Sequence, residues 1–592
     1  MKVLEKYYSI LVIACIVLML FFNIYANSQE SQTVDEGVHL SAGYSYLIKN
    51  DFRMNREHPP LFKELSALPL LFFQDKLESP FEYDSWNEYN QWQFAKDLIY
   101  KSEMSADTIF FIGRLPAILL SILLGLWVFK WARQLFGLIA GLFALLLYTF
   151  SPNIIAHSHY VTTDMALTTF FFITIYYFYK YLKHDDKKNL VLTGIFLGIV
   201  LACKFSSIIL IPILPVLYLI KNLYESNNET FIKSLKKFIK DFTLIYIIAF
   251  LVIFISYGFE LKKPIDDHDI QLLQEKQQAY LAGQNTADLS NLEIKILEIS
   301  DPQKQSGQNI DKLLKTIPVP AYSYFNGLVR IFFHNYHGHL SYLLGNYSDF
   351  GWWYYFPLAF LLKTPITTIL ITVFLILYAF YKILTKKFRR MKIVQFVKAI
   401  PFYLYCLILP PSIYFIFSIT SHINLGLRHI LIIYPFIFVL SGILINKINF
   451  KYKNFLVVIA LLFYLFSSIS VFPHYLAYFN EIVGGPNKGP KYLVDSNIDW
   501  GQDAKNLKKY MVQNDIPYVC LSYFGQAELT YYEIDFRYLP DINNYKGVNQ
   551  INCVVAISVT SLLSEDKAYS WLLDYEPDEK IGYSIYIYDF RK

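Results

Sequence analysis

The sequence contains no nucleic-acid-binding motif and no internal repeat along its 592 residues. Many secondary transporters are built from two inverted halves with a binding site between them. The absence of such halves therefore disfavours that class of membrane protein. The net charge of +5 comes from short basic loops and does not by itself indicate an acidic partner.

Cysteine is rare, with five residues in the whole chain. Cys15, Cys203 and Cys406 lie in apolar segments, which leaves Cys520 and Cys553 in the polar tail. An oxidising compartment would permit a disulfide bond between these two. The sequence leaves open whether they pair.

Hydrophobic residues, in contrast, make up 55% of the chain and aromatic residues 18%, more than a soluble globular chain can bury. Segments of roughly 17 to 25 apolar residues are long enough to cross a membrane. The sequence therefore predicts an α-helical polytopic membrane protein with about 11 transmembrane helices. Their expected spans are 8–27, 109–129, 134–150, 164–182, 189–203, 205–220, 242–259, 356–381, 400–419, 428–446 and 454–472, although 189–220 could also be one broken segment.

Lys and Arg gather in every second gap between these segments. They occur at Lys2 and Lys6, at Lys130 and Arg133, and within 183–188, 221–240, 382–398 and 447–453. Short basic loops lie on the cytoplasmic side, so the N-terminus is expected inside. The loops 28–108 and 260–355 and the tail after 473 are then external. A cleaved signal peptide is disfavoured, because the apolar run from Tyr7 to Tyr25 is longer than the roughly 7 to 15 residues of a signal h-region.

The predicted organisation is a membrane domain over residues 1–475 and a small external α/β domain over 476–592. In the tail, 503–513 has a helical pattern, whereas 518–523, 553–559 and 583–589 have strand patterns. The external loops are expected to contribute an interfacial helix at Pro59–Phe73 and an aromatic stretch at 334–357. The polar start of the second loop is expected to be exposed.

An acidic pair, Asp35 and Glu36, follows the first apolar segment. The same loop continues with Glu57-His58-Pro59-Pro60-Leu61-Phe62-Lys63. A carboxylate, a histidine and a lysine at the lip of a membrane are side chains that a transferase acting on a lipid-borne phosphate requires.

With these motifs in this order, the chain resembles the GT-C membrane glycosyltransferases of family 39, which take sugars from polyprenyl-phosphate carriers. Protein O-mannosyltransferases and the lipid A aminoarabinose transferase are its named relatives, and the stretch 474–503 resembles the bacterial phospholipid-carrier-dependent branch. The matching residues are Asp35-Glu36, His58-Pro59-Pro60-Leu61 with Lys63, Arg114 in GRLPA, Ser151-Pro152 with His157 and Asp164, Lys204, GWWYYFP with Lys363, and Arg428-His429 in GLRH. His58 stands where the aminoarabinose enzyme has a lysine, which leaves the sugar open.

The chemistry of sugar transfer suggests a role for the acidic pair. An alcohol is a poor nucleophile until a base takes its proton during attack on the anomeric carbon. Asp35 is our candidate for that base, and the resemblance implies the same role; its alternative role is to cap a helix starting at Glu36. Glu36 is the second catalytic candidate, or else it holds a cation in place. As the neighbour of Asp35 it is poorly placed to act as a nucleophile on the opposite face, which favours a single displacement with inversion.

The leaving polyprenyl phosphate needs cations or oriented donors to stabilise its charge. The candidates are His58, Lys63, Arg114, Lys204 and Arg428, of which the four cations lie at or near external ends of apolar segments. For each cation the alternative is snorkelling to the interface or a structural ion pair. For His58 the alternative is a helix-start signal. The candidate substrate-binding residues are Asp164, His157, Trp352, Trp353, Tyr354 and His429.

Two clusters invite a metal. His334, His337 and His339 have the short spacing of zinc ligands, but their aromatic surroundings favour a lid over sugar. Asp495, Asp499 and Asp503 are four residues apart, so a helix would place them on one face and permit calcium binding; turns and a helix cap are the other interpretation. We expect no required metal or other cofactor.

The sequence thus predicts a glycosyltransferase that moves one sugar, of hexose type and with mannose as one option, from a polyprenyl-phosphate carrier to an acceptor on the outer face of the bacterial cytoplasmic membrane. The acceptor is a protein, a glycolipid or an envelope polymer, and no nucleic acid is involved. Two alternatives remain open: a transporter or flippase of lipid-linked sugars, and a noncatalytic glycan-binding protein.

Overall fold

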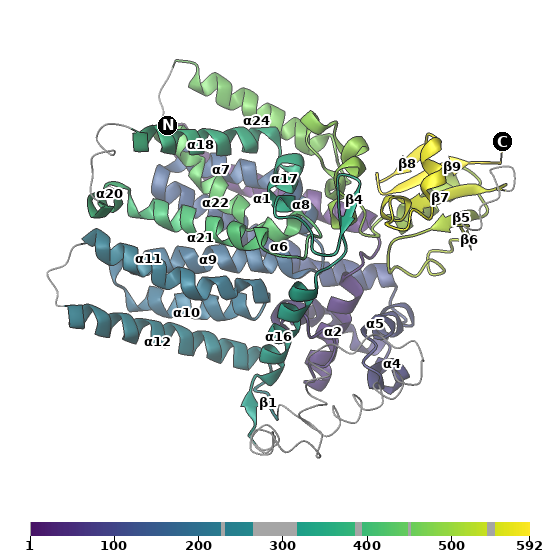
Figure 1. Ribbon diagram of the computed structural model, residues 1–592, viewed down its shortest axis with the longest axis horizontal. Coiled ribbons are helices and arrows are strands. Elements are labelled where there is room, and N and C mark those ends of the chain that lie inside the picture. Colours follow the sequence, from purple (N-terminus) through teal and green to yellow (C-terminus); the bar gives the residue numbers. More distant parts are fainter. Residues whose placement is uncertain are drawn as a thin grey trace.

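The computed structural model describes residues 2–225, 231–263, 317–384, 393–447, 451–541 and 551–591. A bundle of long helices carries short helices and a small β-sheet at one end (Figure 1). Among the described residues, six helical segments are long and apolar enough to cross a membrane: Glu5–Gln29, Ala106–Phe136, Phe205–Tyr224, Ile232–Ser256, Ile366–Leu384 and Phe402–Ile419. The predicted helical membrane class is confirmed.

Each of the predicted apolar spans is helical. The first seven spans correspond to α1 (Lys2–Gln29), α6 (Ala106–Phe136), α7 (Leu138–Thr149), α9 (Thr163–His184), α10 (Lys187–Leu201), α11 (Leu210–Glu225) and α12 (Phe231–Ser256). The later ones correspond to α17 (Tyr355–Lys363) with α18 (Ile366–Leu384), α21 (Phe402–Ile419), α22 (Ile433–Leu440) with α23 (Gly442–Lys447), and α24 (Lys453–Ile469). A further helix of the described chain, α20 (Ile393–Ala399), precedes α21.

Residues 189–220 form two helices, α10 and α11, separated by the 3-10 helix η3 (Phe205–Ile209), in agreement with the two separate spans predicted there. The span 356–381 breaks between α17 and α18, where Thr364 is extended (φ −88°, ψ 134°) ahead of Pro365. A proline disfavours helical backbone at the preceding residue and lacks an N–H group, and both effects favour a break at this position.

Close helix packing in the bundle depends on small residues. On α10, Gly194 and Gly198 lie one turn apart and face α12. A Cβ atom at Gly198 would lie 2.6 Å from Cβ of Val252 and 2.7 Å from the carbonyl oxygen of Ala249. In membranes, such small-residue pairs let two helix backbones approach closely.

The two ends of the bundle differ in content. The N-terminus, the turns α6–α7 and α9–α10, the end of α11 and the start of α12 lie at one end, and the loop 28–108 and the sheet lie at the other (Figure 1). This arrangement is the one that alternating basic gaps predict. The assignment of the basic end to the cytoplasm stays a prediction.

The loop 28–108, which is predicted to be external, folds into short helices against the bundle. They are α2 (Glu36–Lys49), α3 (Leu61–Ala67), η1 (Leu68–Lys76), η2 (Pro80–Glu82), α4 (Asp84–Asn87) and α5 (Gln91–Tyr100). The predicted interfacial helix corresponds to α3 and η1, and α3 is buried at Phe62 and Lys63. A Cβ atom at Gly43 of α2 would lie 2.0 Å from the carbonyl oxygen of Lys63, so the glycine permits this crossing.

Further short elements follow in the chain. They are α8 (Pro152–His157), the β1–β2 pair (Leu261–Lys262 with Val319–Pro320), α16 (Tyr322–His337), the β3–β4 hairpin (Ser341–Leu343 with Asn346–Ser348), η4 (Leu427–Ile430), η5 (Tyr475–Ala477), η6 (Glu481–Val483) and η7 (Pro486–Lys491). The expected exposure of the polar start of the second external loop concerns residues that lie mostly outside the described chain.

The C-terminal domain contains a mixed sheet of order β6-β5-β7-β9-β8. Its strands are β5 (Val519–Ser522), β6 (Phe536–Tyr538), β7 (Val554–Ser558), β8 (Glu579–Ile581) and β9 (Ile585–Asp589), with α25 (Ala504–Gln513) before them and α26 (Val559–Leu562) and η10 (Ser570–Asp574) between strands. The predicted helix and three strands are confirmed. The other two strands have three residues each, too few for a periodic pattern. Cys520 and Cys553 form a disulfide across the parallel pair β5–β7.

A segment that we call the strap, residues 495–503, connects the bundle to this domain. It begins with η8 (Asp495–Asn497) and continues in turns. Asp495, Asp499 and Asp503 therefore share no helix face. The other interpretation is found instead, with turns along this segment and Asp503 at the N-terminal cap position of α25. The Asp499 carboxylate accepts a hydrogen bond from the Thr560 amide (3.0 Å), and the Asp503 carboxylate accepts one from the Ser584 hydroxyl (2.6 Å). Burial raises the pKa of Asp499 to about 7.

This raised pKa makes stability depend on pH. Burial disfavours the ionised form of Asp499 in the folded protein. The stabilisation of the folded state by neutral Asp499 is therefore fully present below the unfolded pKa of about 3.9 and is lost as the pH rises to about 7, up to about 4 kcal/mol in all. We expect Asp499→Asn to lack this part of the pH dependence and to be the more stable protein above pH 7. Apparent Tm of the purified protein from pH 4.5 to 8.5 measures the effect. Asp574→Asn, at an exposed position, is the control; parallel curves for wild type and Asp499→Asn would contradict the prediction.

Candidate functional site

Four charged residues from distant parts of the sequence meet at the sheet-bearing end of the bundle. The ammonium of Lys204 lies 2.5 Å from Oδ1 of Asp164. The guanidinium of Arg428 bridges the two carboxylates through Nη1, at 3.2 Å from Asp35 and 3.5 Å from Asp164. We call these four residues the charged cluster. It contains two anions and two cations, so its formal charge is zero.

Local structure aims each side chain at the cluster. Asp35 is the residue before α2, yet its side chain makes no capping bond and lies against Arg428 instead. Asp164 is in the first turn of α9, and Lys204 lies in the break between α10 and η3. Arg428 is in η4. The side chain of Asp35 is 27% exposed and that of Asp164 only 1%, so Asp35 is the carboxylate that an incoming molecule can reach.

Histidines surround this cluster. The rings of His39 and His58 meet edge to face at 5.0 Å between centroids, and Nδ1 of His39 lies 2.8 Å from the carbonyl oxygen of Val161. Burial, with the charges of His39 and Lys204, holds the pKa of His58 well below its usual value. His58 is therefore neutral at pH 7. The ring of His429 stacks on Phe356 at 6.0 Å.

The strap contributes two residues that the sequence analysis did not assign to the site. The indole ring of Trp500 lies under the guanidinium of Arg428, 4.2 Å from its carbon Cζ. Asp495 has its pKa raised to about 6 by burial, against the opposing effect of the Arg428 charge. The strap thus borders the charged cluster, and Trp500 orients the guanidinium plane of Arg428. His39 is a third missed residue, and its spacing of four from Asp35 was a signal that helix periodicity offered.

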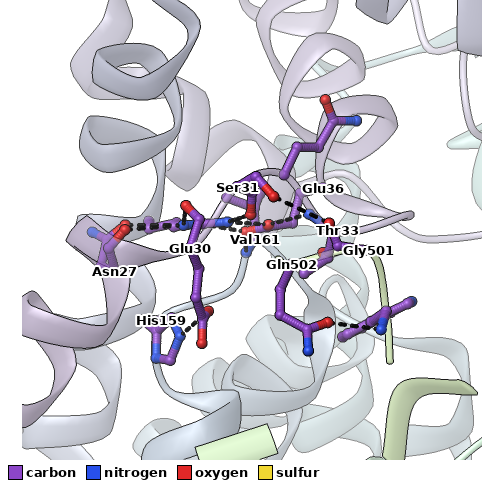
Figure 2. A network of polar contacts seen from close by, with 12 residues as sticks. Asn27, Glu30, Ser31, Thr33, Glu36, His159, Val161, Gly501 and Gln502 are labelled. Atoms are coloured by element: carbon purple, nitrogen blue, oxygen red, sulfur yellow. Dashed lines mark hydrogen bonds and ion pairs between the residues drawn. The ribbon is translucent and has the colours of Figure 1, made fainter. Parts of the chain in front are cut away.

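Glu36 and Arg114 form a separate buried pair. Nη2 of Arg114 lies 2.5 Å from Oε2 of Glu36, and both side chains are at most 1% exposed. The carboxylate of Glu36 also accepts hydrogen bonds from the amides of Thr33 and Val161, and Ser31 and Gln502 lie in the same network (Figure 2). The remaining guanidinium donors bond to Asn27, Glu30 and Ser31. Every donor group of Arg114 thus has a protein partner. Arg114 therefore forms a structural ion pair and Glu36 holds a cation in place, which are the alternative roles considered for these two residues.

Lys63 is also fully buried, and its hydrogen bonds go to residues outside the charged cluster. Its ammonium donates to the hydroxyl of Tyr46, to both oxygens of Asn55 and to the carbonyl of His58. These four acceptors exceed its three protons. Lys63 therefore holds the loop that presents His58, and the structure does not bring it to the other cations. Burial holds its own pKa well below the usual value.

The other predicted residues lie around this region with different exposure. His157 is buried, and burial lowers its pKa to about 3. Trp353 is 70% exposed and Tyr354 is 37% exposed. The amide of Trp352 donates to Oδ1 of Asn424 (2.8 Å), which places the aromatic segment beside the loop before Arg428.

The structure brings together only two of the three histidines that were considered as zinc ligands. Nε2 of His334 lies 3.2 Å from Nδ1 of His339, and Nδ1 of His337 lies 2.9 Å from the carbonyl oxygen of Phe333. No group of three His, Cys, Asp or Glu side chains suited to a metal ion occurs among the residues described by the structure. The expectation that no metal is required stays a prediction.

The sequence of the central helices matches a known family. Residues 106–256, which span α6 to α12 and include Asp164 and Lys204, match the family described as dolichyl-phosphate-mannose-protein mannosyltransferase. The match covers about a quarter of the chain, and over these residues it confirms the predicted resemblance. No curated protein sequence matches the chain significantly.

Several solved structures are similar to this chain. ArnT from Cupriavidus metallidurans bound to undecaprenyl phosphate is 11% identical with a TM-score of 0.41, over 98% of this chain and 97% of that one. The S. cerevisiae protein O-mannosyltransferase Pmt1-Pmt2 complex bound to the sugar donor is 17% identical with a TM-score of 0.31, over 42% of this chain and 33% of that one. The Archaeoglobus fulgidus oligosaccharyltransferase is 12% identical with a TM-score of 0.46, over 97% and 73%.

Proposed function

We propose that this glycosyltransferase moves one sugar of hexose type from a polyprenyl-phosphate carrier to an acceptor on the outer face of the bacterial cytoplasmic membrane. The single observation that carries the proposal is the charged cluster, which combines a reachable carboxylate with two cations at one end of the bundle. The family match supports a carrier of the same chemical type.

In this proposal Asp35 is the general base. It takes the proton of the acceptor hydroxyl while the hydroxyl oxygen attacks the anomeric carbon. The bond from that carbon to the phosphate oxygen breaks, and its electron pair stays on the phosphate. The configuration at the anomeric carbon is inverted. Nη1 of Arg428 donates a hydrogen bond to Oδ2 of Asp35 (3.2 Å), which holds the carboxylate in place.

Lys204 and Arg428 stabilise the charge that develops on the departing phosphate. Asp164 lies between them and orients both, with hydrogen-bond or ion-pair distances of 2.5 and 3.5 Å. His58 and His429 supply neutral hydrogen-bond donors at the rim of the cluster. Trp352, Trp353 and Tyr354 offer aromatic faces for the sugar.

Three candidates from the sequence are not given a direct role in this proposal. Glu36, Arg114 and Lys63 are buried, and their charged groups are occupied by protein partners. We assign them to positioning, Glu36 and Arg114 for the segment that carries Asp35 and Lys63 for the loop that carries His58. No metal ion is required by this mechanism. The domain 476–592 is proposed to select the acceptor, which is a protein, a glycolipid or an envelope polymer.

The test is transfer by the purified full-length protein. Radiolabelled polyprenyl-phosphate sugars are supplied as a panel, with detergent extracts of the native envelope as acceptor. We expect label from at least one donor to enter a product that no longer extracts with the carrier. Binding of donors without transfer across the whole panel would instead support a transporter or flippase of lipid-linked sugars.

A further inference from the structure

A polar cavity of about 300 Å³ lies at the opposite end of the bundle from the charged cluster. It is formed where the ends of α6 and α9 meet the start of α10, near the basic turns (Figure 1). Lys180 of its lining follows Asp164 by 16 residues on α9, which corresponds to roughly 24 Å along the helix. The cavity is therefore separate from the proposed transfer site.

The lining of the cavity is positively charged. Lys130, Lys180 and Lys188 contribute three ammonium groups from three different helices, against the single carboxylate of Asp186. That carboxylate caps α10, because it accepts hydrogen bonds from the amide of Lys188 (2.9 Å) and from the side-chain amide of Asn189 (2.8 Å). Among the ion pairs of the described residues, none neutralises these three lysines. An anion that enters the cavity thus meets net positive charge.

Neutral donors and rigid aromatic rings complete the wall. Tyr176 donates to Oε1 of Gln134 (3.1 Å), which leaves the amide hydrogens of Gln134 as donors. The ring of Tyr177 stacks on Phe196 at 5.2 Å, within the apolar surface of α9 and α10. Lys130 lies over the ring of Trp127, 4.8 Å from its centroid. The cavity therefore offers cations and neutral donors beside an apolar helix surface.

We propose that this cavity binds the phosphate head group of an anionic membrane lipid. Basic pockets between membrane helices on the cytoplasmic side suit such head groups, and lysine is an effective partner of phosphate oxygens. The predicted topology places the cavity at the cytoplasmic leaflet, where its three lysines face the head groups and the lipid chains lie along α9 and α10. Free phosphate shares the same chemistry and is the second source that a test must distinguish.

The test measures lipid retention by the full-length protein with native mass spectrometry. Phosphatidylglycerol is titrated against phosphatidylcholine for the wild type and for Lys130→Gln/Lys180→Gln. Each lysine near a membrane surface contributes about fivefold to binding of an anionic lipid, so we expect the variant to retain phosphatidylglycerol roughly 20-fold more weakly. Lys236→Gln/Lys240→Gln on α12 removes the same charge outside the cavity and should change retention by less than about threefold.

Further variants and a competition measurement distinguish the possible explanations of a change in lipid retention. Lys180→Arg keeps the charge and should keep binding, and an unchanged apparent Tm shows that the double variant is folded. Competition by millimolar inorganic phosphate would support phosphate recognition with free phosphate as its source, whereas its failure supports the lipid. Equal loss in the two double variants, or equal retention of phosphatidylcholine and phosphatidylglycerol by the wild type, would overturn the proposal.

Discussion

Asp35→Asn is expected to abolish sugar transfer while leaving carrier binding intact. The substitution keeps the size of the side chain and one hydrogen-bond acceptor for Arg428, but it removes the group that takes the proton. A positioned general base contributes roughly 10²- to 10⁴-fold to a rate, so kcat should fall by that factor. Because Lys204 and Arg428 remain, the affinity for the polyprenyl-phosphate carrier should change by less than about threefold.

Single-turnover transfer and carrier binding by the same purified protein measure the two effects. Asp75→Asn removes an exposed carboxylate from the same external loop and should leave both rate and binding unchanged. Transfer that persists in Asp35→Asn within tenfold of wild type would assign the base to another group. Loss of carrier binding together with transfer would instead give Asp35 a structural role through its contact with Arg428.

The secondary structure could be predicted where a periodic or compositional pattern extends over many residues. The apolar spans became helices because 17 to 25 residues without charge are stable in a membrane only with their backbone hydrogen bonds satisfied internally. The breaks were less visible. Thr364-Pro365 interrupts an apolar run, and a proline inside such a run either kinks or ends a helix depending on its neighbours.

The charged cluster was predictable in part. Asp35, Asp164, Lys204 and Arg428 were all candidates from the sequence, because ionisable residues near apolar segments are costly without a purpose. Their pairing was not predictable, since spacing along the chain does not say which of four cations meets which of three carboxylates. Lys204 and Arg428 reached the cluster, whereas Arg114 met Glu36. Trp500 was missed because it carries no charge.

The C-terminal segment shows the same limit. The pattern Asp495, Asp499, Asp503 has helical spacing, so a shared helix face was one interpretation of it, beside turns and a helix cap. In the structure Asp495 has a positive φ of 57°, and the carboxylates of Asp499 and Asp503 bond to Thr560 and Ser584 of the sheet domain. The helical spacing of the three aspartates is a local signal. Contacts between residues more than 60 positions apart determine the structure of this segment instead.

The second large effect is expected on stability, from Arg114→Met. This change leaves the Glu36 carboxylate buried without its cation, and removing one partner of a buried ion pair costs about 3 to 5 kcal/mol. The amides of Thr33 and Val161 still donate to Glu36, but two neutral donors do not replace a guanidinium. Apparent Tm and the monodisperse fraction after extraction measure the loss.

The double variant Glu36→Gln/Arg114→Met identifies the cause. It removes both charges, so it should recover more than half of the stability lost in Arg114→Met. Lys237→Met breaks an exposed pair with Asp185, where the side chains are 43% and 67% exposed, and should cost less than about 1 kcal/mol. If Arg114→Met were instead as stable as wild type but failed to bind the carrier, Arg114 would act on the phosphate, as the sequence first suggested, and the charged cluster would need a third cation.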